Sequence, residues 1–155
     1  ISKENLLDVK AAVLSYGGYD FYKYALQNAE TYKNIFWWLA LAKPRGVLGE
    51  EFNPIDHPEL YKAISPIYNI PEASERELPP QLLTAATRDR ITPVHMIEEY
   101  GSALQEKNQE FEFWEHLGRN HAYLDSGRTL IAGNDFVRDG IPALKVMMNF
   151  FEKHL

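Results

Sequence analysis

Two short polar segments of the sequence carry residue types that acid–base chemistry requires. Asp89 follows the mostly apolar run 81–87, and His121 follows the run 110–117 further along the chain. A carboxylate that accepts a hydrogen bond from one imidazole nitrogen fixes the tautomer of the ring, and the other nitrogen can then act as general base and general acid. Asp89 and His121 are therefore candidate catalytic residues, provided that the fold brings them together.

Each of these residues also has a simpler interpretation without catalysis. Asp89 stands between Arg88 and Arg90, so it could pair with either arginine or cap a following helix, and His121 could be an ordinary loop histidine. In a parallel sheet, functional groups gather in the loops at the carboxyl ends of the strands. An acid and a base that follow two consecutive strands favour the functional interpretation.

The strands needed to position this pair are indicated by three short segments. Residues 9–16 and 81–87 are mostly apolar, as buried strands are, and in 110–117 Phe111 and Phe113 alternate with glutamates. Strands that are separated by helices or long connections pair in parallel. We therefore expect an α/β fold with parallel strands and flanking helices.

Helices are expected between these strands and at the end of the chain. The segment 44–80 contains seven prolines and should be an excursion made of turns and short helices. We expect residues 118–140 to form a loop. In the last helix, Leu144, Met147, Met148 and Phe151 recur at helical spacing and predict a buried face. The expected helices span about 20–43, 58–64, Pro93 to about 107, and 141–154.

Composition limits the classes of protein and of partner. A chain of 155 residues with 45% hydrophobic residues suits a single domain over 1–155, with 20–80 as a cap-like excursion. The net charge of −6 and the lack of a basic cluster argue against nucleic-acid binding. No apolar run is long enough to span a membrane, and the compartment stays unknown.

No cofactor or metal is expected. The sequence has no cysteine, which excludes thiolate ligands, and His116 and His121 have no third ligand at a recognised metal-binding spacing.

The segment 82–95 (LLTAATRDRITPVH) resembles the acid-bearing strand and turn of prolyl-oligopeptidase-like and esterase-like α/β-hydrolases. Residues 118–123 (GRNHAY) are similar to the glycine-x-x-histidine loop of that superfamily, and 61–67 resembles the segment that leads back from its cap region. The resemblance implies a partial α/β-hydrolase fold, the C-terminal half of a serine hydrolase. By the same resemblance, Asp89 is the acid and His121 the base of a catalytic triad.

The nucleophile that such a triad needs is not evident. Its usual elbow, Gly-x-Ser-x-Gly, does not occur in this sequence. Ser15 is the nearest candidate, but Val13 puts a branched side chain where the turn needs a small residue. Choosing Ser15 also leaves no strand between the elbow and the acid strand, where the family has one. The better alignment makes 9–16 that intervening strand and Ser15 a loop serine.

A serine in a missing N-terminal half is therefore expected. The chain starts at Ile1 without an initiator methionine, which suits a fragment. We expect the isolated chain to be inactive. A half sheet exposes an unpaired edge, so the chain should associate with its own N-terminal half or with a second copy.

Two functions remain open from the sequence. The first is an esterase or peptidase-like serine hydrolase that acts on a small-molecule ester or a peptide. The alternative is a non-catalytic α/β-hydrolase-like domain that binds a ligand or a partner chain. An aromatic-rich stretch is expected either to line a substrate pocket or to pack in the core; its members are Tyr19, Phe21, Tyr22, Tyr24, Phe36, Trp37 and Trp38.

Overall fold

The computed structural model describes residues 8–27, 48, 52–125 and 134–155. The chain divides into two compact units, one formed by 1–17 and 71–155 and the other by 18–70. The second unit largely coincides with the segment 20–80 that the sequence predicts to be an excursion. Assigning the whole chain to a single domain stays a prediction.

A parallel three-stranded sheet forms the centre of the first unit. Its strands are β1 (Ala12–Ser15), β2 (Gln81–Ala86) and β3 (Phe111–His116), in the order β1-β2-β3. The middle strand is buried along its whole length, whereas β1 is half-buried. The predicted α/β class with parallel strands is confirmed.

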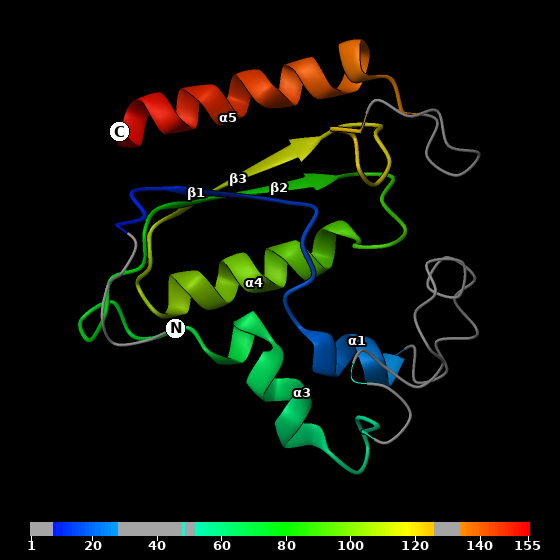
Figure 1. Ribbon diagram of the computed structural model, residues 1–155, viewed down its shortest axis with the longest axis vertical. Coiled ribbons are helices and arrows are strands. Elements are labelled where there is room, and N and C mark those ends of the chain that lie inside the picture. The colour runs from blue at the N-terminus through cyan, green and yellow to red at the C-terminus, as the bar shows by residue number, and fades with distance from the viewer. Residues whose placement is uncertain (1–7, 28–47, 49–51, 126–133) are drawn as a thin grey trace. The chain divides into compact units, whose positions relative to one another are not determined.

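Helices cover both faces of this sheet (Figure 1). Helix α4 (Val94–Glu106) lies on one face and begins directly after Pro93, and α5 (Ile141–His154) lies on the other. In α4, Gly101 permits close packing, because a Cβ atom there would lie 2.9 Å from the ring of Phe111. Both helices agree with the sequence prediction to within a residue or two.

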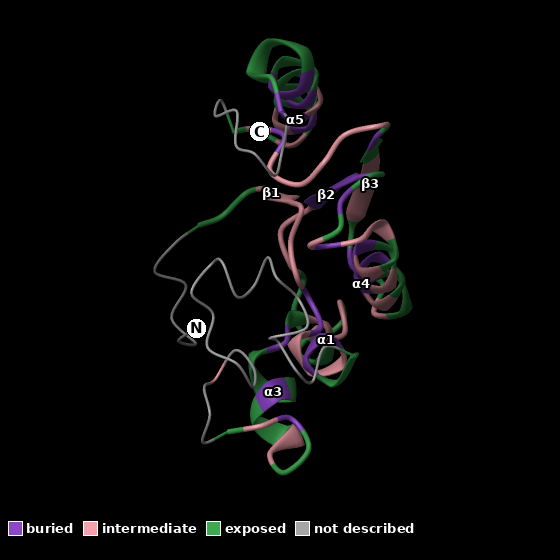
Figure 2. Cartoon of the chain, turned by 90° about the vertical axis from the view of Figure 1, so that its right-hand side faces the viewer, coloured by how far each residue is buried: buried purple, intermediate pink, exposed green. Residues whose placement is uncertain are grey.

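The buried face of α5 differs from the predicted one. The helix buries Ala143, Met147 and Phe150 in the core, whereas Leu144 and Met148 are exposed. Figure 2, which views this helix nearly end-on, shows that it carries both buried and exposed residues. The prediction was wrong for Leu144 and Met148 because α5 carries apolar residues on two adjacent stripes, and only the stripe of Ala143, Met147 and Phe150 is buried in the core. Hydrophobic spacing alone does not choose between such stripes.

A short π-helical turn, η3 (Phe136–Gly140), precedes α5, although the sequence predicts a loop throughout 118–140. The side chain of Asp135 caps this turn by accepting a hydrogen bond from the backbone N–H of Arg138, at 3.0 Å. A polar sequence without clear periodicity hides such a turn, because a cap and a few local bonds define it.

The second unit contains α1 (Phe21–Gln27), α3 (Pro58–Ile64) and η2 (Pro66–Tyr68). The predicted helix around 58–64 is confirmed, and α1 begins where one or two helices were expected over about 20–43; residues 28–43 of that prediction fall outside the described residues. The hydroxyl of Ser65 links α1 to α3. It accepts a hydrogen bond from the backbone N–H of Phe21 at 2.9 Å and donates one to the carbonyl oxygen of Tyr61 at 2.6 Å.

Part of the aromatic-rich stretch lies in this unit. Tyr19 and Tyr24 are buried, whereas Phe21 and Tyr22 are half-buried. The ammonium group of Lys62 lies 5.0 Å from the ring centroid of Tyr22. Packing thus accounts for Tyr19 and Tyr24, and the pocket interpretation stays a prediction. Phe36, Trp37 and Trp38 fall outside the described residues.

Candidate active site

Asp89 lies in the turn between β2 and α4, and its side chain is completely shielded from solvent. One carboxylate oxygen, Oδ1, accepts hydrogen bonds from the backbone N–H groups of Ile91 and Thr92 at 2.8 and 2.9 Å. This arrangement is an Asx turn, which fixes the carboxylate to its own loop. The second oxygen, Oδ2, is directed toward His121.

His121 lies in the loop that follows β3. Its Nδ1 atom is 2.8 Å from Oδ2 of Asp89. Because an ionised carboxylate can only accept hydrogen bonds, Nδ1 carries the hydrogen, and in the neutral ring Nε2 is then the basic nitrogen. The side chain of His121 is 27% exposed. The pair thus combines a buried acceptor with a partly accessible base.

Thr92 and Tyr16 complete the contacts around this pair. The hydroxyl oxygen of Thr92 lies 3.0 Å from Asp89 Oδ2, 3.0 Å from the carbonyl oxygen of Tyr16 and 3.3 Å from His121 Nδ1. The ring of Tyr16 packs at a tilt against the imidazole, with 5.0 Å between centroids. Burial, reinforced by Asp125, raises the pKa of Tyr16, so its phenol stays neutral. Sequence reasoning placed Tyr16 only as a strand end.

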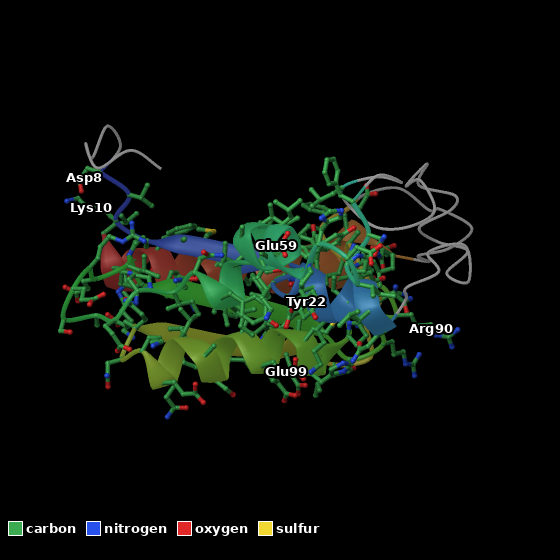
Figure 3. All side chains as sticks on the ribbon, turned by 90° about the horizontal axis from the view of Figure 1, so that it is seen from below. Asp8, Lys10, Tyr22, Glu59, Arg90 and Glu99 are labelled. Carbon is green, nitrogen blue, oxygen red and sulfur yellow. The ribbon has the colours of Figure 1, made fainter. Side chains whose placement is uncertain are left out.

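The simpler interpretation of Asp89 is only partly correct. Its Oδ1 atom does organise the local turn, but Oδ2 lies 2.8 Å from Nδ1 of His121. Neither Arg88 nor Arg90 occupies this position beside Oδ2, and Figure 3 shows Arg90 projecting outward. The juxtaposition of Asp89 and His121 that the strand order predicts is present. Their catalytic role stays a prediction.

The loop that carries His121 adopts an unusual backbone conformation. Gly118 and Ala122 have positive φ angles of 71° and 57°. A left-handed conformation is costly for alanine, so the surrounding structure must hold it in place. Buried Asn134 contributes by donating a hydrogen bond to the carbonyl oxygen of His121 at 2.7 Å. Asn134 lies in the segment expected to be a plain loop, and no pattern in the sequence distinguishes it.

A cluster of ion pairs around one buried carboxylate lies beside this loop. The carboxylate of Asp139, which is fully shielded, contacts the guanidinium groups of Arg138 at 2.6 Å and Arg119 at 2.9 Å. Hydrogen bonding from Arg138 is the main cause that lowers the pKa of Asp139 to about 2, and the charge of Arg119 adds to the effect. Asp139 therefore stays ionised over the range in which proteins normally function.

Replacing Asp139 with asparagine is expected to lower the free energy of unfolding by about 2 kcal/mol at pH 7. The folded pKa of about 2 lies below the ordinary value of 3.8, so the charge stabilises the fold above pH 3.8. This stabilisation is lost as the pH falls through 2, and the deficit should shrink to about 1 kcal/mol at pH 3. Urea unfolding of the variant and the wild type at both pH values measures this difference in the free energy of unfolding.

The matched control for this change is Asp8→Asn. Asp8 is 80% exposed and pairs with Lys10, so the same substitution there should alter the free energy of unfolding by no more than about 0.5 kcal/mol. A deficit for Asp139→Asn that is equal at pH 7 and pH 3 would contradict the assigned pKa.

A sequence model of the prolyl oligopeptidase family matches residues 10–155, which is nearly the whole chain. The chain belongs to the prolyl oligopeptidase family. No curated protein sequence gives a significant match.

Solved structures agree on the fold of this family member. The chain is similar to an acylaminoacyl peptidase of Pyrococcus horikoshii, with a TM-score of 0.65, 20% identity, and coverage of 97% of this chain and 21% of that one. It also resembles an esterase of Thermogutta terrifontis solved with propionate bound, with a TM-score of 0.52 and 18% identity. The match covers 91% of this chain and 43% of the esterase. The chain has part of an α/β-hydrolase fold and spans about a fifth of the peptidase.

Ser15 does not occupy a nucleophile elbow in this prolyl oligopeptidase family chain. It is the last residue of β1 and pairs in register with Thr84 of β2. An elbow requires a sharp strand-to-helix turn, whereas α1 begins only at Phe21. Hydrogen bonding links Ser15 and Thr84 to Tyr123, whose pKa burial raises to about 12. The contacts around Ser15 are thus those of a packed strand end rather than of the predicted loop.

The described part of this family member has neither a metal-binding cluster nor a membrane-spanning helix. Among residues 8–27, 48, 52–125 and 134–155, no group of three histidine, aspartate or glutamate side chains could hold a metal ion. None of the helices seen there has the length and apolar character needed to cross a membrane.

Proposed function

We propose that this chain supplies the acid and the base of a serine hydrolase that cleaves a small-molecule ester or a peptide. The observation that carries the proposal is the 2.8 Å contact between Asp89 Oδ2 and His121 Nδ1, made by a fully shielded carboxylate. The match of the prolyl oligopeptidase family to residues 10–155 supports the same chemistry.

In the proposed reaction, Nε2 of His121 removes the proton from a serine hydroxyl while the serine oxygen attacks the acyl carbon. The resulting imidazolium then returns the proton to the leaving group. Asp89 holds the ring in the required tautomer and stabilises its positive charge, and a water molecule repeats the sequence to release the acid. The backbone donors of the oxyanion hole belong with the nucleophile segment.

We place the serine in an N-terminal half of the full-length protein. The sequence has no Gly-x-Ser-x-Gly motif, and the chain spans only 21% of the peptidase structure. Strand β1 pairs with β2 on one side, and no described strand pairs with its other side. That edge and the exposed Leu144 and Met148 are surfaces that the N-terminal half, or a second copy of the chain, would cover.

A fluorophosphonate probe, which reacts covalently with activated serines, tests this proposal in the full-length natural protein. We expect one adduct, mapped by mass spectrometry to a serine that precedes residue 1. The variant Ser15→Ala should be labelled as fast as the wild type. An adduct on Ser15 would refute the placement of the nucleophile. Absence of both labelling and ester hydrolysis would favour a non-catalytic binding domain instead.

A further inference from the structure

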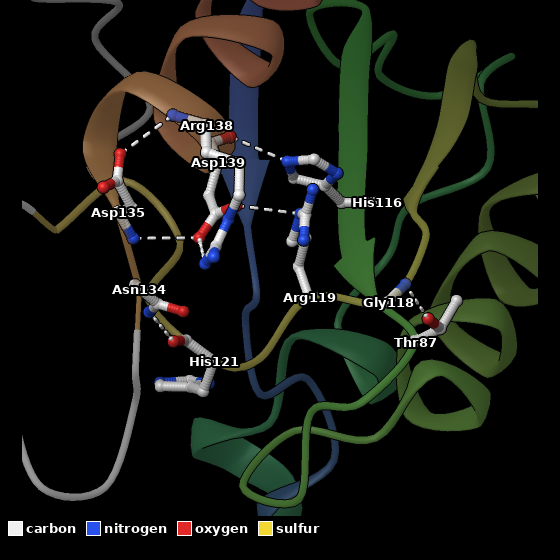
Figure 4. A network of polar contacts seen from close by, with 9 residues as sticks. All are labelled: Thr87, His116, Gly118, Arg119, His121, Asn134, Asp135, Arg138 and Asp139. Atoms are coloured by element: carbon white, nitrogen blue, oxygen red, sulfur yellow. Dashed lines mark hydrogen bonds and ion pairs between the residues drawn. The ribbon is translucent and has the colours of Figure 1, made fainter.

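The loop that carries His121 is attached to the rest of its unit at several points (Figure 4). At its start, the backbone N–H of Gly118 donates to the hydroxyl of Thr87 at 2.7 Å. At His121 itself, the carbonyl accepts from Asn134 at 2.7 Å. Between these points, Arg119 adds attachments through both its backbone and its side chain.

Arg119 connects three elements. Its carbonyl oxygen accepts the backbone N–H of Arg88, the residue before Asp89, at 2.8 Å. Its Nε atom lies 2.9 Å from Oδ1 of Asp139, at the turn that precedes α5. Arg119 is thus bonded on one side to the turn of the proposed acid and paired on the other with a fixed carboxylate, two residues before the proposed base.

Asp139 is well suited to be the fixed end of this connection. Its Oδ2 atom accepts the backbone N–H of Asp135 at 2.9 Å, and its carbonyl oxygen lies 2.7 Å from Nε2 of His116 at the end of β3. Since a carbonyl only accepts, this nitrogen of His116 carries a hydrogen. Asp139, which belongs to η3, is therefore bonded both to the residue that caps this turn and to the end of β3, and its side chain has no exposed surface.

We infer that Asp139 is a positioning residue that, through Arg119, holds the loop of His121 against the turn of Asp89. The inference rests on the proposed function, because positioning matters only if His121 acts as a base. His121 stands on a loop with two positive φ angles rather than on a strand or helix, so the loop's attachments determine where the imidazole lies. A displacement of about 1 Å can cost on the order of a hundredfold in rate.

Two arginines that share the same carboxylate allow a matched test. Arg119 and Arg138 both pair with Asp139, but only Arg119 belongs to the loop of His121. A purely structural cluster would respond similarly to loss of either guanidinium. If the cluster positions His121, loss of Arg119 lowers the rate of the chemical step. Loss of Arg138 then lowers only the stability of the fold.

The kinetic experiment compares Arg119→Ala, Arg119→Lys and Arg138→Ala in the full-length protein, with all variants verified as folded at the assay temperature. We expect Arg119→Ala to lower kcat for ester hydrolysis by about 10- to 100-fold, with KM changed less than about twofold. Arg119→Lys retains a charged donor and should recover part of the loss. Arg138→Ala should keep kcat within about twofold. Equal losses of kcat in both alanine variants would overturn the inference.

A second measurement separates this inference from the proposed function. The hydrogen shared by His121 Nδ1 and Asp89 should give a strongly downfield proton resonance, assigned by its loss in His121→Ala. We expect Arg138→Ala to keep this signal and Arg119→Ala to lose or broaden it. That result supports positioning even if the wild type hydrolyses no ester, in which case only the proposed function fails. An unchanged signal in Arg119→Ala overturns the inference.

Discussion

Replacing His121 with alanine in the full-length protein is expected to lower kcat for ester hydrolysis by about 10⁵-fold. In the proposed mechanism the side chain provides the nitrogen that removes the serine proton and later returns it, so its loss would affect both halves of the reaction. The imidazole is partly exposed and its Nδ1 is held by Asp89 at 2.8 Å. Truncation should therefore remove the base without opening a large cavity. Steady-state kinetics with a chromogenic ester measure the effect.

His95→Ala is the matched control for this substitution. His95 is exposed in the first turn of α4 and lies outside the contacts that surround Asp89. We expect kcat and KM of this variant to stay within about twofold of the wild type, since exposed substitutions away from a site are usually small in effect. If His121→Ala kept more than about a tenth of the wild-type kcat, His121 would not be the base.

The sheet and its two covering helices could be predicted because their signals are local and redundant. Residues 81–87 are mostly apolar and are followed by a polar turn and Pro93, which marks a helix start. In a parallel sheet, the carboxyl ends of neighbouring strands meet at one edge. This rule alone is enough to bring Asp89 near His121, although the two are 32 residues apart in the sequence.

The support around the pair could not be predicted, because it depends on contacts between distant segments. Thr92 bonds to the carbonyl of Tyr16, 76 residues earlier, and Tyr16 itself has a positive φ of 42° that no sequence pattern indicates. Asn134 and Asp139 lie in a polar segment without periodicity, where no residue type signals burial. Such positions are identified by tertiary contacts and not by spacing.

The exposed stripe of α5 shows a different reason for failure. Leu144 and Met148 fit a buried helical face as well as Ala143 and Met147 do, so the pattern admits two orientations of the helix. If an N-terminal half covers the outer stripe in the full-length protein, both faces have an apolar partner. The prediction for Leu144 and Met148 would then have failed only because it assumed that a single face of α5 is buried.

Asp89→Asn is expected to lower kcat by about 10⁴-fold, although asparagine has nearly the same size as aspartate. The reason lies in how the two carboxylate oxygens are used. Oδ1 accepts two backbone N–H groups, from Ile91 and Thr92, while Oδ2 faces Nδ1 of His121. An amide side chain has one acceptor and one donor group, so the two backbone donors will orient its oxygen toward themselves.

This orientation places the NH₂ group of the introduced amide opposite the imidazole of His121. A donor there requires Nδ1 to accept, which moves the ring hydrogen to Nε2, the nitrogen that receives the serine proton in the proposed mechanism. The isosteric variant would therefore hold the wrong tautomer in place. Asp89→Ala removes both the carboxylate and any amide donor at this position, so it should retain at least as much activity as Asp89→Asn.

The ranking of these variants distinguishes tautomer control from simple loss of charge. Kinetics of Asp89→Asn and Asp89→Ala are compared with those of Asp56→Asn, which makes the same chemical change at an exposed carboxylate bonded to Asn53. The control should keep wild-type kcat within about twofold. If Asp89→Asn were clearly more active than Asp89→Ala, the carboxylate would act mainly by filling space. Because two backbone donors fix the side chain, Asp89→Asn should lower kcat at least as much as Asp89→Ala, although it is the smaller chemical change.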